Sequence, residues 1–146
     1  MKTVYIMRGI SGSGKSTVAK KLCHEGFICS TDAYFMVNGE YKFDRSKLGQ
    51  YHQWNFENFC NFLKQDAATV CVDNTNTTRK EYQRYIDKAK EFGYEVMVVT
   101  VGNPWVRQGS ETQALDKEYI KKCADRNSHG VPFEVVWQQA MRFELC

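Results

Sequence analysis

The sequence predicts an α/β fold in which helices cover both faces of a parallel sheet. Short runs of apolar and β-branched residues alternate with longer segments of helical periodicity, an order that builds repeated strand–helix units. The 146 residues are 42% hydrophobic with only two prolines, and they contain no internal repeat or low-complexity linker. We therefore expect one folded domain over residues 1–146.

The first half of the chain is predicted to contain two strands and two helices. Apolar and β-branched residues predict strands at Thr3–Arg8 and at residues 27–30. Helical spacing predicts a helix over Lys15–Glu25, which Gly26 ends, and a longer helix over Arg45–Lys64. The side chains expected to face the core from these helices are Val18, Leu22, Cys23, Leu48, Tyr51, Phe59, Phe62 and Leu63.

The second half continues the alternation of strands and helices. Strands are expected at residues 69–74 and 94–101, the second being the strongest strand signal in the chain, with a helix over Arg79–Phe92 between them. The charged stretch Glu111–Arg126 is predicted to be helical, and a last amphipathic helix follows Pro132. The inward side chains of that helix are expected to be Val135, Val136, Ala140 and Phe143.

A glycine-rich motif follows the first predicted strand. Residues Gly9–Ser16 read GISGSGKS and match G-x-x-x-x-G-K-S in the strand–helix context that this phosphate-binding loop requires. Its glycines let backbone N–H groups converge on phosphate oxygens, and the next helix adds its positive end. Lys15 would contact the β- and γ-phosphates, and the Ser16 hydroxyl would bind Mg²⁺. The expected nucleotide-binding residues of the loop are Gly12, Ser13, Gly14, Lys15, Ser16 and Thr17.

Two aspartates close other predicted strands, whose carboxyl ends lie at the edge where ligands of such sheets bind. Asp73 ends the strand at 69–74 and is expected either to hold the Mg²⁺ shell beside Ser16 or to cap the turn that follows. Asp32 follows the strand at 27–30 and is expected to be a general base for an incoming hydroxyl, or alternatively an N-cap or Asx-turn residue at the start of the next segment.

A cation near the predicted site would stabilise the charge of phosphoryl transfer. Arg126 follows the charged helix and is one candidate, with Arg107 and His129 as competitors. From spacing alone, Arg126 is better explained as a solvated residue at a helix end.

Taken together, these motifs resemble a known family. The ordered set GISGSGKST, STDAY, VDNTNT, NPW and RNSHGVP resembles P-loop polynucleotide kinases of the phage 5′-hydroxyl kinase type and the small P-loop proteins related to them. The resemblance covers nearly the whole chain. It implies a three-layer P-loop NTPase of the kinase-like type, with a parallel sheet flanked by helices and a helical lid at about residues 104–131.

The resemblance also implies an activity and a role for each site residue. The activity is transfer of the γ-phosphate of ATP, with Mg²⁺, to a 5′-hydroxyl of DNA or RNA. Lys15 would be a catalytic residue at the phosphates, and Asp32 would be the general base. Ser16 and Asp73 would lie at the metal, and Arg126 would be a catalytic lid arginine that also binds the nucleotide.

Two positions depart from the family pattern. The phage-type kinases carry an arginine three positions after the base, where this chain has Phe35. A second lid arginine is replaced near His129. Between the base candidate and the long helix, rings and cations interleave around the turn dipeptide Asn38-Gly39, a composition that suits stacking on bases or core packing. These residues are Tyr34, Phe35, Tyr41, Lys42, Phe43, Arg45 and Lys47; His52 and Trp54 are expected to pack rather than bind.

Two other functions fit the same motifs. A P-loop kinase of a small hydroxylated metabolite or antibiotic would use the same loop and Asp32, and Phe35 in place of arginine favours it slightly. A non-catalytic ATP- or GTP-binding module is the other, although such a module has no use for a base.

Composition sets limits on location and partners. The net charge of +3 does not by itself indicate a nucleic-acid partner. The six cysteines show no C-x-x-C pair or zinc spacing. The N-terminus is a poor signal peptide, and no run approaches 18 apolar residues, so no membrane partner is expected. We expect a soluble cytoplasmic protein.

Overall fold

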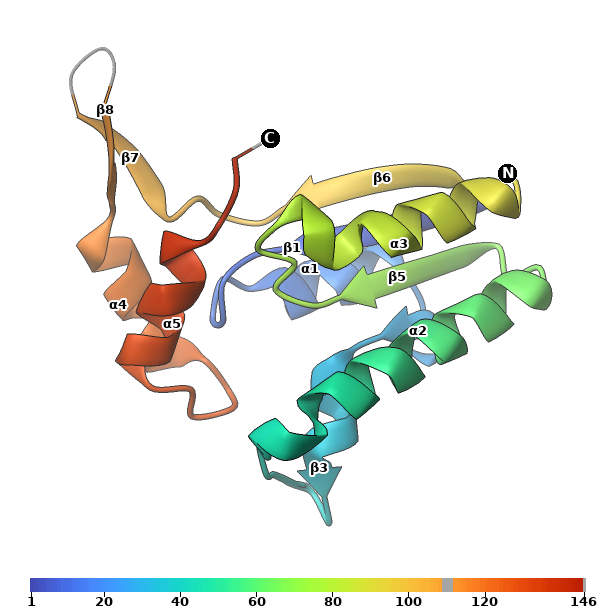
Figure 1. Cartoon of the computed structure of the whole chain (residues 1–146), viewed down its shortest axis with the longest axis horizontal. Helices are drawn as coiled ribbons and strands as arrows, with labels where there is room; N and C mark the ends of the chain where they lie inside the picture. The colour runs from blue at the N-terminus through green and yellow to red at the C-terminus, as the bar shows by residue number, and fades with distance from the viewer. Residues whose placement is uncertain (109–111, 146) are drawn as a thin grey trace.

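Four parallel strands form the central sheet of the computed structural model, which describes residues 1–108 and 112–145. The strands lie in the order β2-β5-β1-β6 and are β1 (Thr3–Arg8), β2 (Ile28–Cys29), β5 (Thr69–Asp73) and β6 (Glu95–Thr100). Helix α1 (Lys15–Leu22) packs on one face of the sheet. Helices α2 (Leu48–Lys64) and α3 (Arg79–Glu91) pack on the other (Figure 1). The predicted three-layer α/β fold is therefore confirmed.

The strand register brings all four carboxyl ends to one edge of the sheet. β1 pairs with β5 and β6, so that Val4 lies between Val70 and Val96. The side chains of β1 and β5 are covered on both faces, which explains why their sequences are almost continuously apolar instead of alternating with polar residues. Because the four strands are parallel, the loops that follow them all start from the same edge of the sheet, where ligands of such sheets bind.

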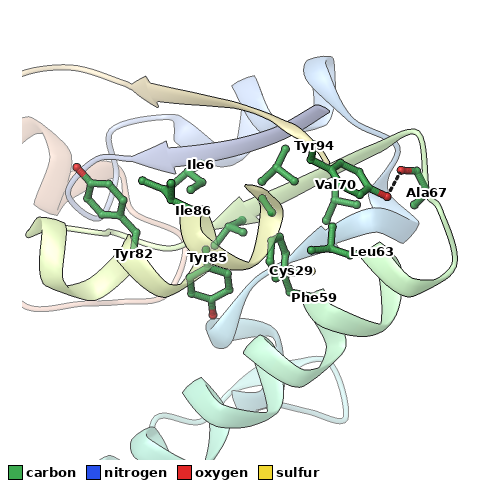
Figure 2. Close-up of a cluster of buried hydrophobic side chains, with 13 residues drawn as sticks. Ile6, Cys29, Phe59, Leu63, Ala67, Val70, Tyr82, Tyr85, Ile86 and Tyr94 are labelled. Atoms are coloured by element: carbon green, nitrogen blue, oxygen red, sulfur yellow. Dashed lines mark hydrogen bonds between the residues drawn. The ribbon is translucent and has the colours of Figure 1, made fainter. Parts of the chain in front are cut away.

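The larger hydrophobic core lies between the sheet and helices α2 and α3 (Figure 2). Phe59 and Leu63 project into it from α2, as their helical spacing predicted. The Tyr94 hydroxyl also reaches this layer and donates a hydrogen bond of 2.7 Å to the Ala67 carbonyl. Because that hydroxyl is paired, burying the tyrosine ring carries no penalty for an unsatisfied polar group.

A separate apolar cluster attaches the C-terminal helices to the phosphate-binding loop. These helices are α4 (Lys117–Arg126) and α5 (Phe133–Met141), which pack against each other. Ile10, from the glycine-rich loop, is buried among their side chains. Val136 and Ala140 face inward as expected, whereas Val135 is 42% exposed, so its predicted inward orientation is wrong.

The predicted helix over Glu111–Arg126 is wrong in its first part. Strands β7 (Trp105–Gln108) and β8 (Thr112–Leu115) form an antiparallel hairpin, and the helix begins only at Lys117; Glu111 itself lies outside the described residues. The Asp116 carboxylate accepts the Tyr119 N–H at 3.1 Å, which fixes the helix start there. Backbone pairing with β7 outweighs the helical character of the short stretch before it.

Two other boundaries differ from the predictions, whereas the predicted turn at Asn38-Gly39 is confirmed. Helix α1 ends at Leu22 because Cys23 is extended, and a 3₁₀ helix follows at Glu25–Phe27. The segment before α2 forms a 3₁₀ helix at Arg45–Lys47, which the Asp44 side chain caps. The turn dipeptide Asn38-Gly39 closes a small hairpin of β3 (Met36–Val37) and β4 (Glu40–Tyr41). Its two residues have φ angles of 51° and 82°, as the tight hairpin turn requires.

The cysteines are consistent with packing roles. The five described cysteines are free thiols, and Cys23, Cys29, Cys71 and Cys123 are buried. Burial raises the pKa of the Cys29 thiol to about 12. Among the described helices, none has the length and apolar character needed to cross a bilayer.

A buried arginine joins the end of β1 to two distant segments. The Arg8 side chain is 1% exposed, and its guanidinium lies over the Phe143 ring. It donates to the main-chain carbonyls of Asn76 at 2.8 Å, Thr77 at 3.0 Å and Glu144 at 2.6 Å. The fork of the guanidinium makes this three-way contact possible, because one planar group presents several donors at fixed angles.

Replacing Arg8 by lysine should destabilise the domain strongly. A lysine ammonium is a single compact donor group and cannot reach three separate carbonyls, which would be left buried and unpaired. We expect Arg8→Lys to lower the free energy of unfolding by about 2–4 kcal/mol in urea titrations. The matched variant Arg45→Lys, at an exposed position, should change it by less than about 0.5 kcal/mol. Equal free energies of unfolding for the two variants would contradict a stabilising role for the three hydrogen bonds of Arg8.

Candidate active site

The glycine-rich loop turns sharply between β1 and α1. Gly12 and Gly14 have φ angles of 82° and 93°, in the left-handed region that residues with a side chain rarely adopt. Gly14 is the N-cap of α1, and no side chain caps that end of the helix. The first N–H groups of α1 are therefore directed to the loop, where an anionic phosphate would complete their hydrogen bonding.

Asp73 contacts the loop directly, as the sequence predicted. The Ser16 hydroxyl donates a hydrogen bond of 2.7 Å to Asp73 Oδ2. The carboxylate is 7% exposed, and its other oxygen, Oδ1, has no partner among the described residues. A hydroxyl and a carboxylate are the hard oxygen ligands that Mg²⁺ takes beside nucleotide phosphates, so this pair fits that ion. The alternative interpretation, in which Asp73 caps the following turn, is not supported by its contacts.

Asp32 lies at the end of β2, in a 3₁₀ helix over Thr31–Phe35. Thr31 anchors this helix, since its N–H donates to Asn74 Oδ1 at 3.0 Å and its hydroxyl lies 2.9 Å from His52 Nδ1. The loops that follow β2 and β5 are thereby tied together. The half-buried Asp32 carboxylate is not the N-cap, a position that Ser30 takes.

The partner of Asp32 is a tyrosine hydroxyl. Tyr41 Oη, at the end of the β3–β4 hairpin, donates to Asp32 Oδ1 at 3.2 Å. Burial, followed by the negative charge of Asp32 and the hydrogen bond to it, raises the pKa of Tyr41 well above its usual value. The phenol therefore stays protonated at neutral pH and acts as the donor. The contact shows that Asp32 is placed to bind a hydroxyl group.

Arg126 ends α4 and lies against the glycine-rich loop. Its Nε donates to the Gly12 carbonyl at 2.5 Å. The helix is seated tightly, because a Cβ added to Gly12 would lie 1.9 Å from the Cys123 carbonyl oxygen. Arg126 is exposed beyond this contact. Of its two competitors, Arg107 lies exposed on the β7–β8 hairpin, and His129 packs on Tyr41.

The remaining predicted loop residues lie where the motif places them. Lys15 and Ser16 open α1, and Thr17 follows on its exposed side. The Ser13 hydroxyl is buried without a partner among the described residues. Ser11 is held from outside the motif, since its N–H donates to Gln139 Oε1 of α5 at 2.9 Å.

The aromatic stretch after Asp32 divides into a packed part and an exposed part. Phe35 is 1% exposed and packs against Tyr41, Phe43 and Tyr51, so the idea that it stacks on bases is wrong. Phe43 is 53% exposed. A cavity of about 460 Å³ opens here between the hairpin and the start of α2. It is lined by Tyr34, Phe35, Val37, Lys42, Phe43, Asp44, Arg45, Lys47 and Tyr51.

Two contacts at the site were not predicted. The hydrogen bond from Tyr41 to Asp32 joins residues nine positions apart, and the signal that could have located it is the Asn38-Gly39 turn that folds one back over the other. The close approach of Cys123 to Gly12 spans more than a hundred positions and has no local signature.

A family comparison now identifies the domain. A model described as "AAA domain" matches residues 4–146. This chain belongs to the AAA domain family.

Individual relatives cover the same region. The chain is 31% identical over 142 residues to human NEDD4-binding protein 2, covering 95% of this chain and 7% of the relative. It is 29% identical over 108 residues to mouse 2′,3′-cyclic-nucleotide 3′-phosphodiesterase, covering 71% of this chain and 25% of the relative. The chain therefore spans only a small part of the length of these relatives.

Solved structures establish the fold type. A gluconokinase from Sinorhizobium meliloti 1021 aligns with 98% of this chain and 75% of its own, with a TM-score of 0.58 and 17% identity. The Pnkp1/Rnl/Hen1 complex contains a chain that aligns with 79% of this one and 44% of its own, with a TM-score of 0.57 and 17% identity. The predicted kinase-like P-loop fold and the resemblance to P-loop kinases are thus confirmed.

The contact between α4 and the glycine-rich loop can be tested by comparing Gly12 with Gly39, a glycine of the same φ. Gly12 and Gly39 both have φ of 82°, yet a Cβ at Gly39 would meet nothing within 4 Å. Alanine at either position carries the same left-handed strain of about 1 kcal/mol. We expect Gly12→Ala to cost at least about 2 kcal/mol more in urea unfolding, since it must push the Cys123 carbonyl away. If Gly12→Ala and Gly39→Ala lower the free energy of unfolding equally, the contact between Gly12 and Cys123 does not contribute to stability.

Proposed function

We propose that this domain is an ATP-dependent kinase that transfers the γ-phosphate to a 5′-hydroxyl of DNA or RNA. One observation carries the proposal: the Asp32 carboxylate binds a hydroxyl group, that of Tyr41. Asp32 lies at the same edge of the sheet as the phosphate-binding loop, whose Ser16 is hydrogen-bonded to Asp73. A module that only binds nucleotide has no need of a carboxylate placed in this way.

Each residue has a role in this reaction. The loop N–H groups and Lys15 hold the phosphates, and Arg126, already on the Gly12 carbonyl, balances charge that develops on the transferred group. Asp32 accepts the proton of the attacking hydroxyl. A new O–P bond forms to the γ-phosphorus as its bond to the β–γ bridging oxygen breaks, and ADP leaves. Ser16 and Asp73 would hold Mg²⁺, whose charge would neutralise that of the phosphates.

The segment that follows Asp32 in the chain favours a polynucleotide acceptor. The cavity between its hairpin and the start of α2 carries the cations Lys42, Arg45 and Lys47 and the exposed ring of Phe43, beside one carboxylate, that of Asp44. Cations can follow a phosphate backbone, and a ring can stack on a base whatever its sequence. The name of the mouse relative, a cyclic-nucleotide phosphodiesterase, also connects this sequence type with nucleotide chemistry.

A small hydroxylated acceptor is the second candidate. The family arginine that would recognise a nucleic-acid phosphate is replaced by Phe35, which is buried and brings no charge. An acceptor without phosphates would not need that arginine.

Labelling with γ-³²P-ATP and Mg²⁺ distinguishes these functions. We expect label on 5′-hydroxyl oligonucleotides, and Lys15→Ala and Asp32→Asn should each lower the rate about 10²–10⁴-fold. Asp87→Asn, at an exposed position of α3, serves as the matched control and should keep full activity. Thermal unfolding of each variant shows that the fold is intact.

The outcomes separate the alternatives. Labelling of sugars or other small alcohols, with no oligonucleotide labelled, would favour the small acceptor. Full labelling by Asp32→Asn would exclude Asp32 as the base. Tight ATP binding without transfer to any acceptor would leave the nucleotide-binding module.

A further inference from the structure

Tyr41 connects the two sides of the site. Its hydroxyl lies on Asp32, and its ring lies 4.2 Å from the His129 ring, with 32° between the ring planes. Asp32 belongs to the segment after β2, whereas His129 belongs to the loop between α4 and α5. In Figure 1 the loop between α4 and α5 belongs to the helices at the left, whereas strand β3 of the hairpin lies at the bottom, below α2. The tilted pair of rings therefore joins the β3–β4 hairpin to the loop between α4 and α5.

The loop that carries His129 is braced from inside. Asn127 Nδ2 donates to the carbonyls of Ala124 at 2.6 Å and Val131 at 3.0 Å. Asn127 Oδ1 accepts the N–H groups of His129 at 3.2 Å and Val131 at 2.8 Å. One amide thus fixes both ends of the loop, so that His129 presents its ring to Tyr41 from a fixed support three residues after Arg126.

The hydroxyl of Tyr41 occupies a position that an acceptor hydroxyl would need. A general base must accept a hydrogen bond from the hydroxyl that it deprotonates. Tyr41 already donates to Asp32 in this way, and its 3.2 Å distance is longer than the usual range for hydroxyl donors. A better-placed hydroxyl can therefore replace it. Tyr41 is half-buried, and its ring packs on Phe35 as well as on His129, so its position is set by packing.

We propose that Tyr41 is an acceptor gate: its hydroxyl holds the acceptor position on Asp32 until the incoming 5′-hydroxyl displaces it, and His129 holds the gate closed. This inference rests on the function proposed above. It makes Tyr41 a residue that sets acceptor affinity, acting in competition with the substrate. It also gives His129 a role on the acceptor side of the site.

The test is a comparison of KM and kcat for a 5′-hydroxyl oligonucleotide at saturating ATP and Mg²⁺. Tyr41→Phe removes the competing hydroxyl but keeps the ring on His129. We expect its acceptor KM to fall about fivefold, the scale of one weak hydrogen bond lost from the competition, with kcat within about twofold of the unchanged protein. The matched control Tyr94→Phe also removes one hydroxyl donor, but its bond to the Ala67 carbonyl lies at the amino ends of β5 and β6, away from the site, so this variant should leave KM unchanged.

A double-mutant cycle tests the part played by His129. His129→Ala should lower the acceptor KM in the same direction, because Tyr41 loses its support. In Tyr41→Phe/His129→Ala the two effects should not add, since both act on one contact. Independent, additive effects would overturn the role of His129 in the gate.

The outcomes for gate and function can be told apart. If the unchanged protein labels oligonucleotides and Tyr41→Phe has an equal or higher KM, the gate is overturned while the proposed function stands. A lower kcat at constant KM would also overturn it, because Tyr41 would then assist the transition state. If neither protein labels any oligonucleotide, the proposed function falls and the gate falls with it. Labelling by Tyr41→Phe alone would support both.

Discussion

The arrangement of the site depends on the hydrogen bonds that converge at the end of β1. Arg8 binds the carbonyls of Asn76 and Thr77, and the Asn76 side chain returns a bond of 2.7 Å to the Met7 carbonyl. The Gly9 N–H donates to the Thr75 carbonyl at 3.1 Å. The loop after β5 is thereby fixed against the start of the phosphate-binding loop. Asp73 lies where the loop after β5 begins. The distance between Asp73 and Ser16 is therefore fixed by these hydrogen bonds as well as by the direct Ser16–Asp73 contact.

Arg8 also fixes the segment that follows α5. Its bond to the Glu144 carbonyl and its position over the Phe143 ring hold the segment after α5. Since α5 packs on α4 and α4 lies on Gly12, the C-terminal helices are held against the phosphate-binding loop. A buried cation in the core is costly unless its donors are satisfied, and here main-chain carbonyls satisfy them.

The sequence was sufficient for the parts of the site that local chemistry specifies. The β1–loop–α1 unit, Asp32 and Asp73 all follow apolar strands, and strand ends of a parallel sheet share one edge, so their proximity could be predicted. The hairpin β7–β8 could not, because Thr112–Leu115 is a strand only through its pairing with Trp105–Gln108. Likewise, the residue type of Phe35 does not show whether its ring stacks on a base or packs in a cluster. Only its neighbours Tyr41, Phe43 and Tyr51 decide between these roles.

The two halves of the site differ in how they are held, and this difference follows from their contacts. On the phosphate side, Ser16, Asp73 and Gly12 are fixed by short bonds and by packing that leaves no room for a methyl group. On the acceptor side, a long hydrogen bond and one contact between tilted rings connect Asp32, Tyr41 and His129. Arg126 and His129 lie three residues apart on one braced segment, with one contact on each side. Movement of that segment would therefore change the acceptor side first, because its contacts there are the weaker ones.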